Sequence, residues 1–246
     1  HDNGYDISDY TAVNPLFGSM DDFEEMIQVG KEYGIEFMLD MVLNHCSTEH
    51  EWFQKALAGD NYYQDFFFLR DEPTDWLSKF GGSAWAPFGD TGKYYLHLYD
   101  VTQADLNWHN PRVREELFKV VHFWLDKGVK GFRFDVINVI GKDEILENCP
   151  ENDGKPAYTD RPIVHEYLHM LNEETFGTDE AIMTVGEMSA TNIENCILYT
   201  APERHELSMA FNFHHLKVDY ENGQKWTLKN FDFEELKRLF HTWGKE

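Results

Sequence analysis

The chain has 246 residues and is 42% hydrophobic, which allows one large domain or two small ones and excludes a disordered tail. Its 21 basic and 45 acidic side chains give a formal net charge of −24, so nucleic acid and anionic membrane surfaces are poor partners. No apolar run approaches the roughly 20 residues that a membrane-spanning helix needs. The three cysteines are too scattered for a disulfide framework or a zinc site. We therefore expect no metal, no cofactor and a reducing, cytoplasmic compartment.

Helix and strand signals alternate along the chain. Helices are expected at residues 20–33, 111–127, 163–176, 192–199 and 233–243, and strands at residues 35–39, 131–137, 181–187 and 207–213. Ser19 and Asn110 stand at helix-capping positions, and Pro111 suits a first helical turn. Gly34 and Gly128 follow the first two helices, as is typical of helix ends. Four helix-to-strand steps predict parallel strands joined by crossover helices.

Polar residues end each of these strands, which is typical of a barrel whose functional groups gather at the carboxyl ends of its strands. The chain lacks the glycine-rich phosphate loop that an open doubly wound sheet usually carries. We therefore predict an α/β fold of the (β/α)8 or TIM-barrel type, present here as a partial barrel of about four strands. An open sheet remains the alternative on pattern alone.

Residues 46–104 interrupt the alternation with a long segment rich in aromatic side chains, glycine and proline. A structureless loop of that length within a domain is improbable, so we interpret it as a small inserted subdomain (domain B) beside the strand ends. The predicted division is a barrel segment at 1–45, the inserted subdomain at 46–104 and a second barrel segment at 105–246. The chain opens within a polar motif and stops just after a helix, so we expect it to be an interior piece of a longer protein.

Two carboxylates stand at predicted strand ends. Arg133 and Asp135 are two residues apart on a strand and therefore project to the same side. A guanidinium beside a carboxylate keeps it ionised, as a carboxylate nucleophile requires, although a buried structural ion pair is the alternative. Glu187 ends an apolar strand, where partial burial would favour the protonated acid; a solvent-facing strand end is the alternative. Two carboxylates held in different protonation states are the pattern of glycoside hydrolysis.

Other polar residues suit the binding of sugar hydroxyls. Asn44 and His45 follow the first strand, although a histidine satisfied within the core is the more common finding. The opening run of residues 2–6 places Tyr5 between carboxylates, which suits stacking on a sugar face, and a surface turn is the alternative.

Taken in order, these motifs resemble a known family. Asp40 with Asn44 and His45, residues 131–135 and residues 185–187 are similar to strand-end motifs of the α-amylase clan of retaining glycosidases. Residues 103–108 and 2–6 resemble its oligo-1,6-glucosidase branch. Within that branch, the chain is similar to the trehalose-6-phosphate hydrolases at residues 78–82, 183–189 and, above all, 207–220.

The resemblance implies a role for each matching residue. Asp135 would be the nucleophile that forms a covalent glucosyl intermediate, and Arg133 would orient it. Glu187 would protonate the leaving oxygen and then activate water, with the two carboxyl groups roughly 5 Å apart. Three side chains would hold the non-reducing glucose by stacking or by hydrogen bonds: Tyr5, Asp2 and His45.

A phosphorylated substrate requires local positive charge in a protein whose net charge is −24. His214, His215 and Lys217 form a basic cluster at the end of the last strand, and Lys79 of the inserted segment can reach the same place. Lysine binds phosphate as a point charge, and the charge of histidine depends on pH. Our hypothesis is that Lys217, helped by these neighbours, binds the phosphate of a small sugar phosphate, trehalose 6-phosphate, which is cleaved to glucose and glucose 6-phosphate. A solvated polar loop is the alternative.

The third carboxylate of the clan, in an Asn-His-Asp motif, does not occur in these 246 residues. We therefore expect the chain alone to be an open half-barrel that is inactive and prone to associate. Two other functions compete with the leading one. An α-glucosidase of the oligo-1,6-glucosidase type, acting on neutral sugars, is disfavoured by the basic cluster at 214–217. A non-catalytic relative is disfavoured because Asp135 and Glu187 are both present.

Overall fold

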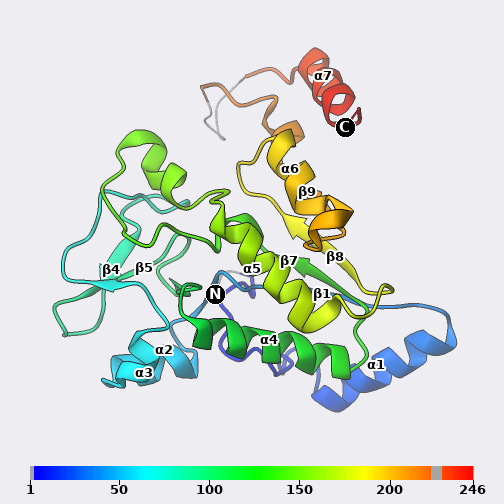
Figure 1. Cartoon of the computed structure of the whole chain (residues 1–246), viewed down its shortest axis with the longest axis horizontal. Helices are drawn as coiled ribbons and strands as arrows, with labels where there is room; N and C mark the ends of the chain where they lie inside the picture. Colours follow the sequence, from blue (N-terminus) through cyan, green and yellow to red (C-terminus); the bar gives the residue numbers. More distant parts are fainter. Residues whose placement is uncertain (1–2, 223–228, 246) are drawn as a thin grey trace.

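The computed structural model describes residues 3–222 and 229–245. A four-stranded parallel sheet lies at its centre, in the order β1, β7, β8, β9 (Figure 1). The strands are β1 (Met38–Met41), β7 (Gly131–Phe134), β8 (Met183–Glu187) and β9 (Met209–Phe211). Because all four run in the same direction, their carboxyl ends meet at one edge of the sheet. Within the described ranges, no helix is both long and apolar enough to cross a bilayer.

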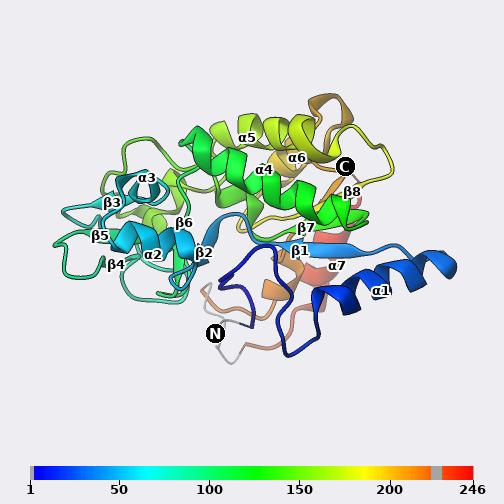
Figure 2. The same ribbon diagram turned by 90° about the horizontal axis from the view of Figure 1, so that it is seen from below.

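Helices precede, connect and follow these strands. They are α1 (Met20–Glu32), α4 (Pro111–Asp126), α5 (Ile163–Leu171), α6 (Ile193–Thr200) and α7 (Phe233–Trp243). Both views show α4 and α5 side by side over one face of the parallel sheet (Figures 1 and 2). Apolar side chains of these two helices, such as Leu117 and Leu168, belong to the same buried cluster as Phe132 and Phe134 of β7. The helices thus bury the outer face of the strands that end in polar residues.

The expected helix caps are confirmed. The Ser19 hydroxyl accepts a hydrogen bond from the Asp22 backbone, and the Asp22 side chain accepts one in return, which is a capping box. The Asn110 side chain accepts from the Arg112 backbone at the start of α4. Gly34 and Gly128 follow their helices with φ of 71° and 94°, values that glycine adopts readily.

Several element boundaries differ from the expectation. The strands expected at 181–187 and 207–213 are the shorter β8 and β9. The strand expected at residues 35–39 begins at Met38, because the Ile35 backbone N–H still bonds back to Gly30 of α1 at 2.8 Å. The strand expected at 131–137 ends at Phe134, because Val136 turns the chain with a φ of 39°. The helix expected through residue 176 leaves α-helical geometry after Leu171 and continues as a π-helical turn.

The segment after β1 forms a structure of its own beside the parallel sheet (Figures 1 and 2). An antiparallel pair, β2 (His45–Ser47) and β6 (Gln103–Asp105), brackets it. Between them lie α2 (Glu51–Leu57), α3 (Asn61–Gln64) and the antiparallel sheet of β3 (Leu69–Arg70), β5 (Tyr94–Leu96) and β4 (Trp85–Pro87). A buried cluster joins Trp76 and Leu96 of this segment to Val136 and Val139 after β7. The predicted domain boundaries at 1–45, 46–104 and 105–246 stay a prediction.

Candidate active site

Two buried carboxylates lie at the carboxyl ends of neighbouring strands. Glu187 is the last residue of β8 and Asp135 follows the last residue of β7, and they are 8% and 7% exposed. The Asp135 backbone N–H donates to the carbonyl of Met41 at 3.0 Å, which ties it to the end of β1. Val136 then adopts the left-handed conformation and enters the 3-10 turn Ile137–Val139. The alternative, a strand-end Glu187 that faces solvent, is wrong, because the residue is buried.

Arg133 joins the two carboxylates. Its Nη1 lies 2.8 Å from Asp135 Oδ1, and its Nη2 forms an ion pair with Glu187 Oε2. The same Nη1 lies 2.7 and 2.8 Å from the two carboxylate oxygens of Asp40 on β1. Burial acts against the cation, but the hydrogen bond and charge of Asp40 and the charge of Asp135 raise the pKa of Arg133. The site therefore holds a permanent positive charge between its acidic groups.

These groups face a cavity of about 320 Å³, which we call the carboxylate cavity. Tyr5 and His45 line it with Arg133 and the two carboxylates. The Tyr5 hydroxyl donates to Asp40 Oδ2 at 3.0 Å, and the Nε2 atom of His45 lies 3.1 Å from the Tyr5 carbonyl. Burial and the charge of Asp40 raise the pKa of Tyr5. The structure thus brings together five of the predicted site residues, while Asp2 lies outside the described residues.

A fully buried polar cluster supports His45 from behind. Asn44 Nδ2 lies 3.2 Å from His45 Nδ1 and donates to Asp105 Oδ1 at 3.0 Å. Lys142 Nζ lies 2.9 Å from Asp105 Oδ1 and donates to Asn44 Oδ1 at 2.9 Å. Burial lowers the pKa of Lys142. Sequence reasoning missed this lysine, and the signal that could have found it is a cation at the end of the mostly apolar stretch 136–141.

A second cavity of about 390 Å³ adjoins the first, and Phe213 lines both. Lys79, Lys155 and Lys217 converge on this lysine cavity, and Asp153 is the single carboxylate among the described residues that line it. Burial and the charges of the other two lysines lower the pKa of Lys79 to about 8. Burial and the charge of Lys155 also lower the pKa of Lys217. Like charges gathered in this way are typical of an anion site.

The two histidines lie elsewhere. His214 and His215 share the 3-10 turn His214–Lys217 with Lys217, but neither lines the lysine cavity. The His214 ring lies 5.1 Å from that of Trp243, and the His215 ring stacks 5.8 Å from that of Phe240, so both pack against α7. Burial and the charges of its neighbours Lys217 and His215 lower the pKa of His214. Lys155, which the sequence did not single out, lines the lysine cavity together with Lys79 and Lys217.

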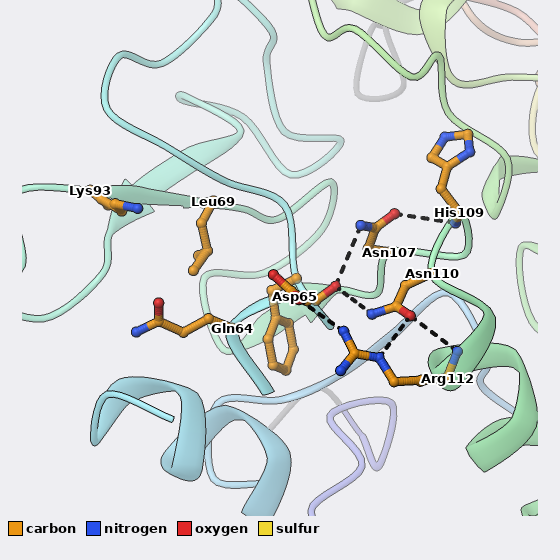
Figure 3. Close-up of a pocket in the computed structure, with 9 residues that line it drawn as sticks. Gln64, Asp65, Leu69, Lys93, Asn107, His109, Asn110 and Arg112 are labelled. Atoms are coloured by element: carbon orange, nitrogen blue, oxygen red, sulfur yellow. Dashed lines mark hydrogen bonds and ion pairs between the residues drawn. The ribbon is translucent and has the colours of Figure 1, made fainter. Parts of the chain in front are cut away.

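A third cavity, of about 450 Å³, lies apart from the carboxylates (Figure 3). Arg112 enters it from the start of α4, and its Nη2 lies 2.8 Å from Asp65 Oδ2. Asn107 and Asn110 donate to the Asp65 carbonyl at 3.4 and 3.0 Å. Because Asp65 neutralises Arg112 and is the single carboxylate in the lining, this cavity lacks the paired acids that glycoside hydrolysis uses.

Comparison with known proteins identifies the family. The model of the α-amylase catalytic domain matches residues 1–246. The chain belongs to the α-amylase family. The catalytic domain of that family is a TIM barrel, so the predicted fold is confirmed, and the four parallel strands are part of such a barrel.

Several relatives of this α-amylase domain are similar along its whole length. The trehalose-6-phosphate hydrolase of Bacillus subtilis is 50% identical over 250 residues, which cover 99% of this chain and 44% of that protein. The enzyme of the same name from Escherichia coli is 51% identical, over 98% of this chain and 45% of that protein. An oligo-1,6-glucosidase of Parageobacillus thermoglucosidasius is 43% identical, over 100% of this chain and 46% of that protein. The predicted resemblance is confirmed.

Solved structures agree with this family assignment. The crystal structure of Bacillus licheniformis trehalose-6-phosphate hydrolase has a TM-score of 0.95 at 52% identity and covers 99% of this chain and 45% of its own. The isomaltulose synthase of Klebsiella sp. LX3 has a TM-score of 0.93 at 34% identity. The chain therefore spans less than half the length of the relatives that it matches.

Proposed function

We propose that the protein carrying this chain is a retaining glycoside hydrolase that cleaves trehalose 6-phosphate into glucose and glucose 6-phosphate. The observation that supports this best is that Phe213 lines both cavities. A disaccharide with its non-reducing glucose in the carboxylate cavity and its phosphate in the lysine cavity has its glycosidic bond between the two. The similarity to two trehalose-6-phosphate hydrolases, at 50% and 51% identity, supports the same assignment.

The mechanism that we propose uses both buried carboxylates. Asp135 attacks the anomeric carbon while Glu187 gives a proton to the glycosidic oxygen, and glucose 6-phosphate leaves. Glu187 then removes a proton from water, which attacks the glucosyl intermediate and releases glucose and free Asp135. A single guanidinium contacts both carboxyl groups, which favours the spacing of about 5 Å found in retaining enzymes over the wider spacing of inverting ones.

The remaining residues of the carboxylate cavity bind and orient. The positive charge of Arg133 stabilises the ionised form of Asp135 and directs it through a hydrogen bond. We assign Tyr5 to the face of the non-reducing glucose, and Asp2 and His45 to its hydroxyl groups. The buried cluster behind His45 fixes the direction of its ring.

Phosphate recognition is assigned to the lysine cavity. A phosphate monoester carries about −1.5 to −2 charges at neutral pH, and three lysines against one aspartate offer it a net positive site. We add Lys155 to the predicted pair of Lys79 and Lys217, and we keep His214 and His215 as supporting groups that flank Lys217. The three cysteines are free thiols, in keeping with the reducing, cytoplasmic compartment that we assign to the protein.

Hydrolysis by the native protein tests this function, with trehalose 6-phosphate, trehalose and isomaltose compared. We expect kcat/KM to favour the phosphorylated sugar by about 100-fold, since charge-assisted contacts contribute roughly 1.5–3 kcal/mol each. Asp135→Asn and Glu187→Gln should lose activity on every substrate. Lys217→Ala should raise KM for trehalose 6-phosphate and leave the rate on trehalose unchanged.

The other outcomes discriminate between functions. Activity on isomaltose alone would make the protein a neutral α-glucosidase and remove the phosphate assignment. No activity on any of the three sugars would favour a non-catalytic relative. An unchanged KM in Lys217→Ala would remove that lysine from phosphate binding.

A further inference from the structure

One side-chain amide joins the loops that carry the two catalytic carboxylates. Asn138 lies three residues after Asp135, in the 3-10 turn that follows β7, and it is fully buried. Its Oδ1 accepts from the Ser189 backbone N–H at 2.8 Å, and its Nδ2 donates to the Ser189 carbonyl at 3.0 Å. Ser189 lies two residues after Glu187. The amide therefore forms a two-point bond to the backbone of the loop that follows β8.

This bond lies just beyond the end of the β-sheet ladder. The last paired residues of β7 and β8 are Phe134 and Gly186, one residue before each carboxylate. Past that point, Asn138 takes over the connection that backbone pairing provides within the sheet. The positions of Asp135 and Glu187 are thus enclosed between the ladder on one side and the Asn138 amide on the other.

The Asp160 carboxylate holds Asn138 in place. Asp160 Oδ1 accepts from Asn138 Nδ2 at 2.8 Å, and the Asp160 backbone N–H donates to the Asn138 carbonyl at 3.0 Å. Two groups of α6 complete the shell of Asp160: Tyr199 donates to Oδ1 at 2.9 Å, and Asn195 Nδ2 donates to Oδ2 at 2.8 Å. Every polar atom of the Asn138 side chain is therefore used, and its rotamer is fixed.

We propose that Asn138 is a positioning residue that sets the placement of Glu187 relative to Asp135 through its two-point bond to Ser189. This inference rests on the proposed function, because it concerns the acid and the nucleophile of that reaction. A retaining mechanism needs the two carboxyl groups on opposite sides of one bond at a defined separation. A displacement of about 1 Å at a reacting group can cost about 100-fold in rate.

The same loop also contacts the lysine cavity. The Lys79 ammonium donates to Ser189 Oγ at 2.8 Å, so Ser189 connects Asn138 with one of the phosphate-binding lysines. Because the Asn138 bonds reach the backbone of Ser189 and the Lys79 bond reaches its side chain, the two contacts can be changed separately. Replacement of Asn138 leaves Lys79 and its charge in place.

The test compares Asn138→Ala in the native protein on two substrates. Trehalose 6-phosphate has a poor leaving group that needs the proton of Glu187, whereas a dinitrophenyl α-glucoside leaves without protonation. We expect kcat/KM to fall about 100-fold on the first substrate and much less on the second, with KM for trehalose 6-phosphate little changed. Asn195→Ala is the matched control, because it removes a bond to the same Asp160 carboxylate without touching the Ser189 loop. It should leave both rates near those of the wild type.

A second variant guards against a folding defect in Asn138→Ala. Asn138→Ser keeps a small polar side chain and places no charge beside Asp160, but it is too short to bond both backbone groups of Ser189, so we expect the same selective loss in a folded protein. Equal losses on the two substrates, in either variant, would show a merely structural residue and overturn the inference. A wild-type protein that cleaves neither substrate would instead overturn the proposed function, and this inference with it.

Discussion

At the scale of single residues, the buried charge of Asp105 depends on Lys142 for its counter-charge. Its ammonium and the Asp105 carboxylate are both fully buried, 2.9 Å apart. We expect Lys142→Ala to lower the free energy of unfolding by about 3–5 kcal/mol, because it leaves the Asp105 charge buried without a counter-charge. Urea denaturation of the native protein measures this change.

Lys119 offers a control for this prediction. Its ion pair with Glu116 lies at the surface of α4, with the lysine side chain 68% exposed. Lys119→Ala should change the free energy of unfolding by at most about 1 kcal/mol. If both variants gave the same small effect, the buried pair would contribute no more than a surface one.

Lys79 gives the proposed phosphate site a pH dependence. Burial and the two neighbouring lysines lower its pKa to about 8, so in the free protein its positive charge is present below that pH and is lost above it. We expect kcat/KM for trehalose 6-phosphate to fall as the pH rises through about 8, while kcat/KM for trehalose shows no such step. Lys79→Arg should remove the step, because arginine stays charged at that pH. Parallel pH profiles for the two sugars would contradict the prediction.

At the scale of the elements, the ends of neighbouring side chains pack closely against Gly186 of β8 and would have to shift to admit a Cβ atom. A Cβ atom there would lie 2.6 Å from Leu207 Cδ1 and 2.7 Å from Met188 Cε. Gly186→Ala should therefore destabilise the fold by about 1–3 kcal/mol. It should also lower kcat by more than tenfold, because Glu187 is the next residue.

Gly131 provides the comparison at the other end of the neighbouring strand. A Cβ atom at Gly131 would lie 2.9 Å from the Met183 carbonyl oxygen, which is also too close. Gly131→Ala should destabilise the fold to a similar degree but leave kcat of the folded fraction near the wild-type value. A comparable loss of kcat in both variants would mean that the effect of Gly186→Ala is not local to Glu187.

Local signals predicted most of the elements, and the reason is that they act over a few residues. The caps at Ser19 and Asn110 bond to backbone groups two or three residues away, so they are visible in the sequence. The start of β1 could not be predicted in this way. It depends on where the chain leaves α1 and first meets its neighbour, at the bond from the Lys130 N–H to the Phe37 carbonyl.

The residues of the candidate site also differ in whether local sequence signals could predict them. Asp135 and Glu187 could be predicted because each follows an apolar strand. Asn138 could not, because its partner Ser189 is 51 residues away. Lys155 could not, because only the fold brings it to the same cavity as Lys79 and Lys217. His214 and His215 show the converse: they are neighbours of Lys217 in sequence, but their rings contact side chains of α7 that sequence spacing could not predict.

At the scale of the whole molecule, the outer strands of the described sheet are unpaired on one side, and large apolar side chains are exposed. In the described part of the chain, β1 and β9 each have a partner strand on one side only. Ile35, just before β1, is 55% exposed, and Phe233 and Phe240 of α7 are 66% and 60% exposed. Open strand edges and exposed apolar side chains both favour association between chains.

We therefore expect residues 1–246, expressed alone, to sediment as species larger than a monomer and to lack hydrolase activity. Phe233→Glu and Phe240→Glu together should reduce the association, because they place charge on the exposed face of α7. A monomeric, active preparation of the 246-residue chain would contradict this prediction. Sedimentation velocity and hydrolysis of trehalose 6-phosphate provide the two measurements.

Val136 connects the inserted segment to the rate of the reaction. A β-branched residue in the left-handed conformation stores about 1–3 kcal/mol of backbone strain, and here that strain lies directly after Asp135. The buried cluster that Val136 shares with Trp76 and Leu96 offsets it. Packing of the segment around β4 and β5 thus holds Val136 in its strained conformation. Local unfolding of that segment would allow the turn at Val136 to relax. On heating, we therefore expect the catalytic rate to fall before the barrel unfolds.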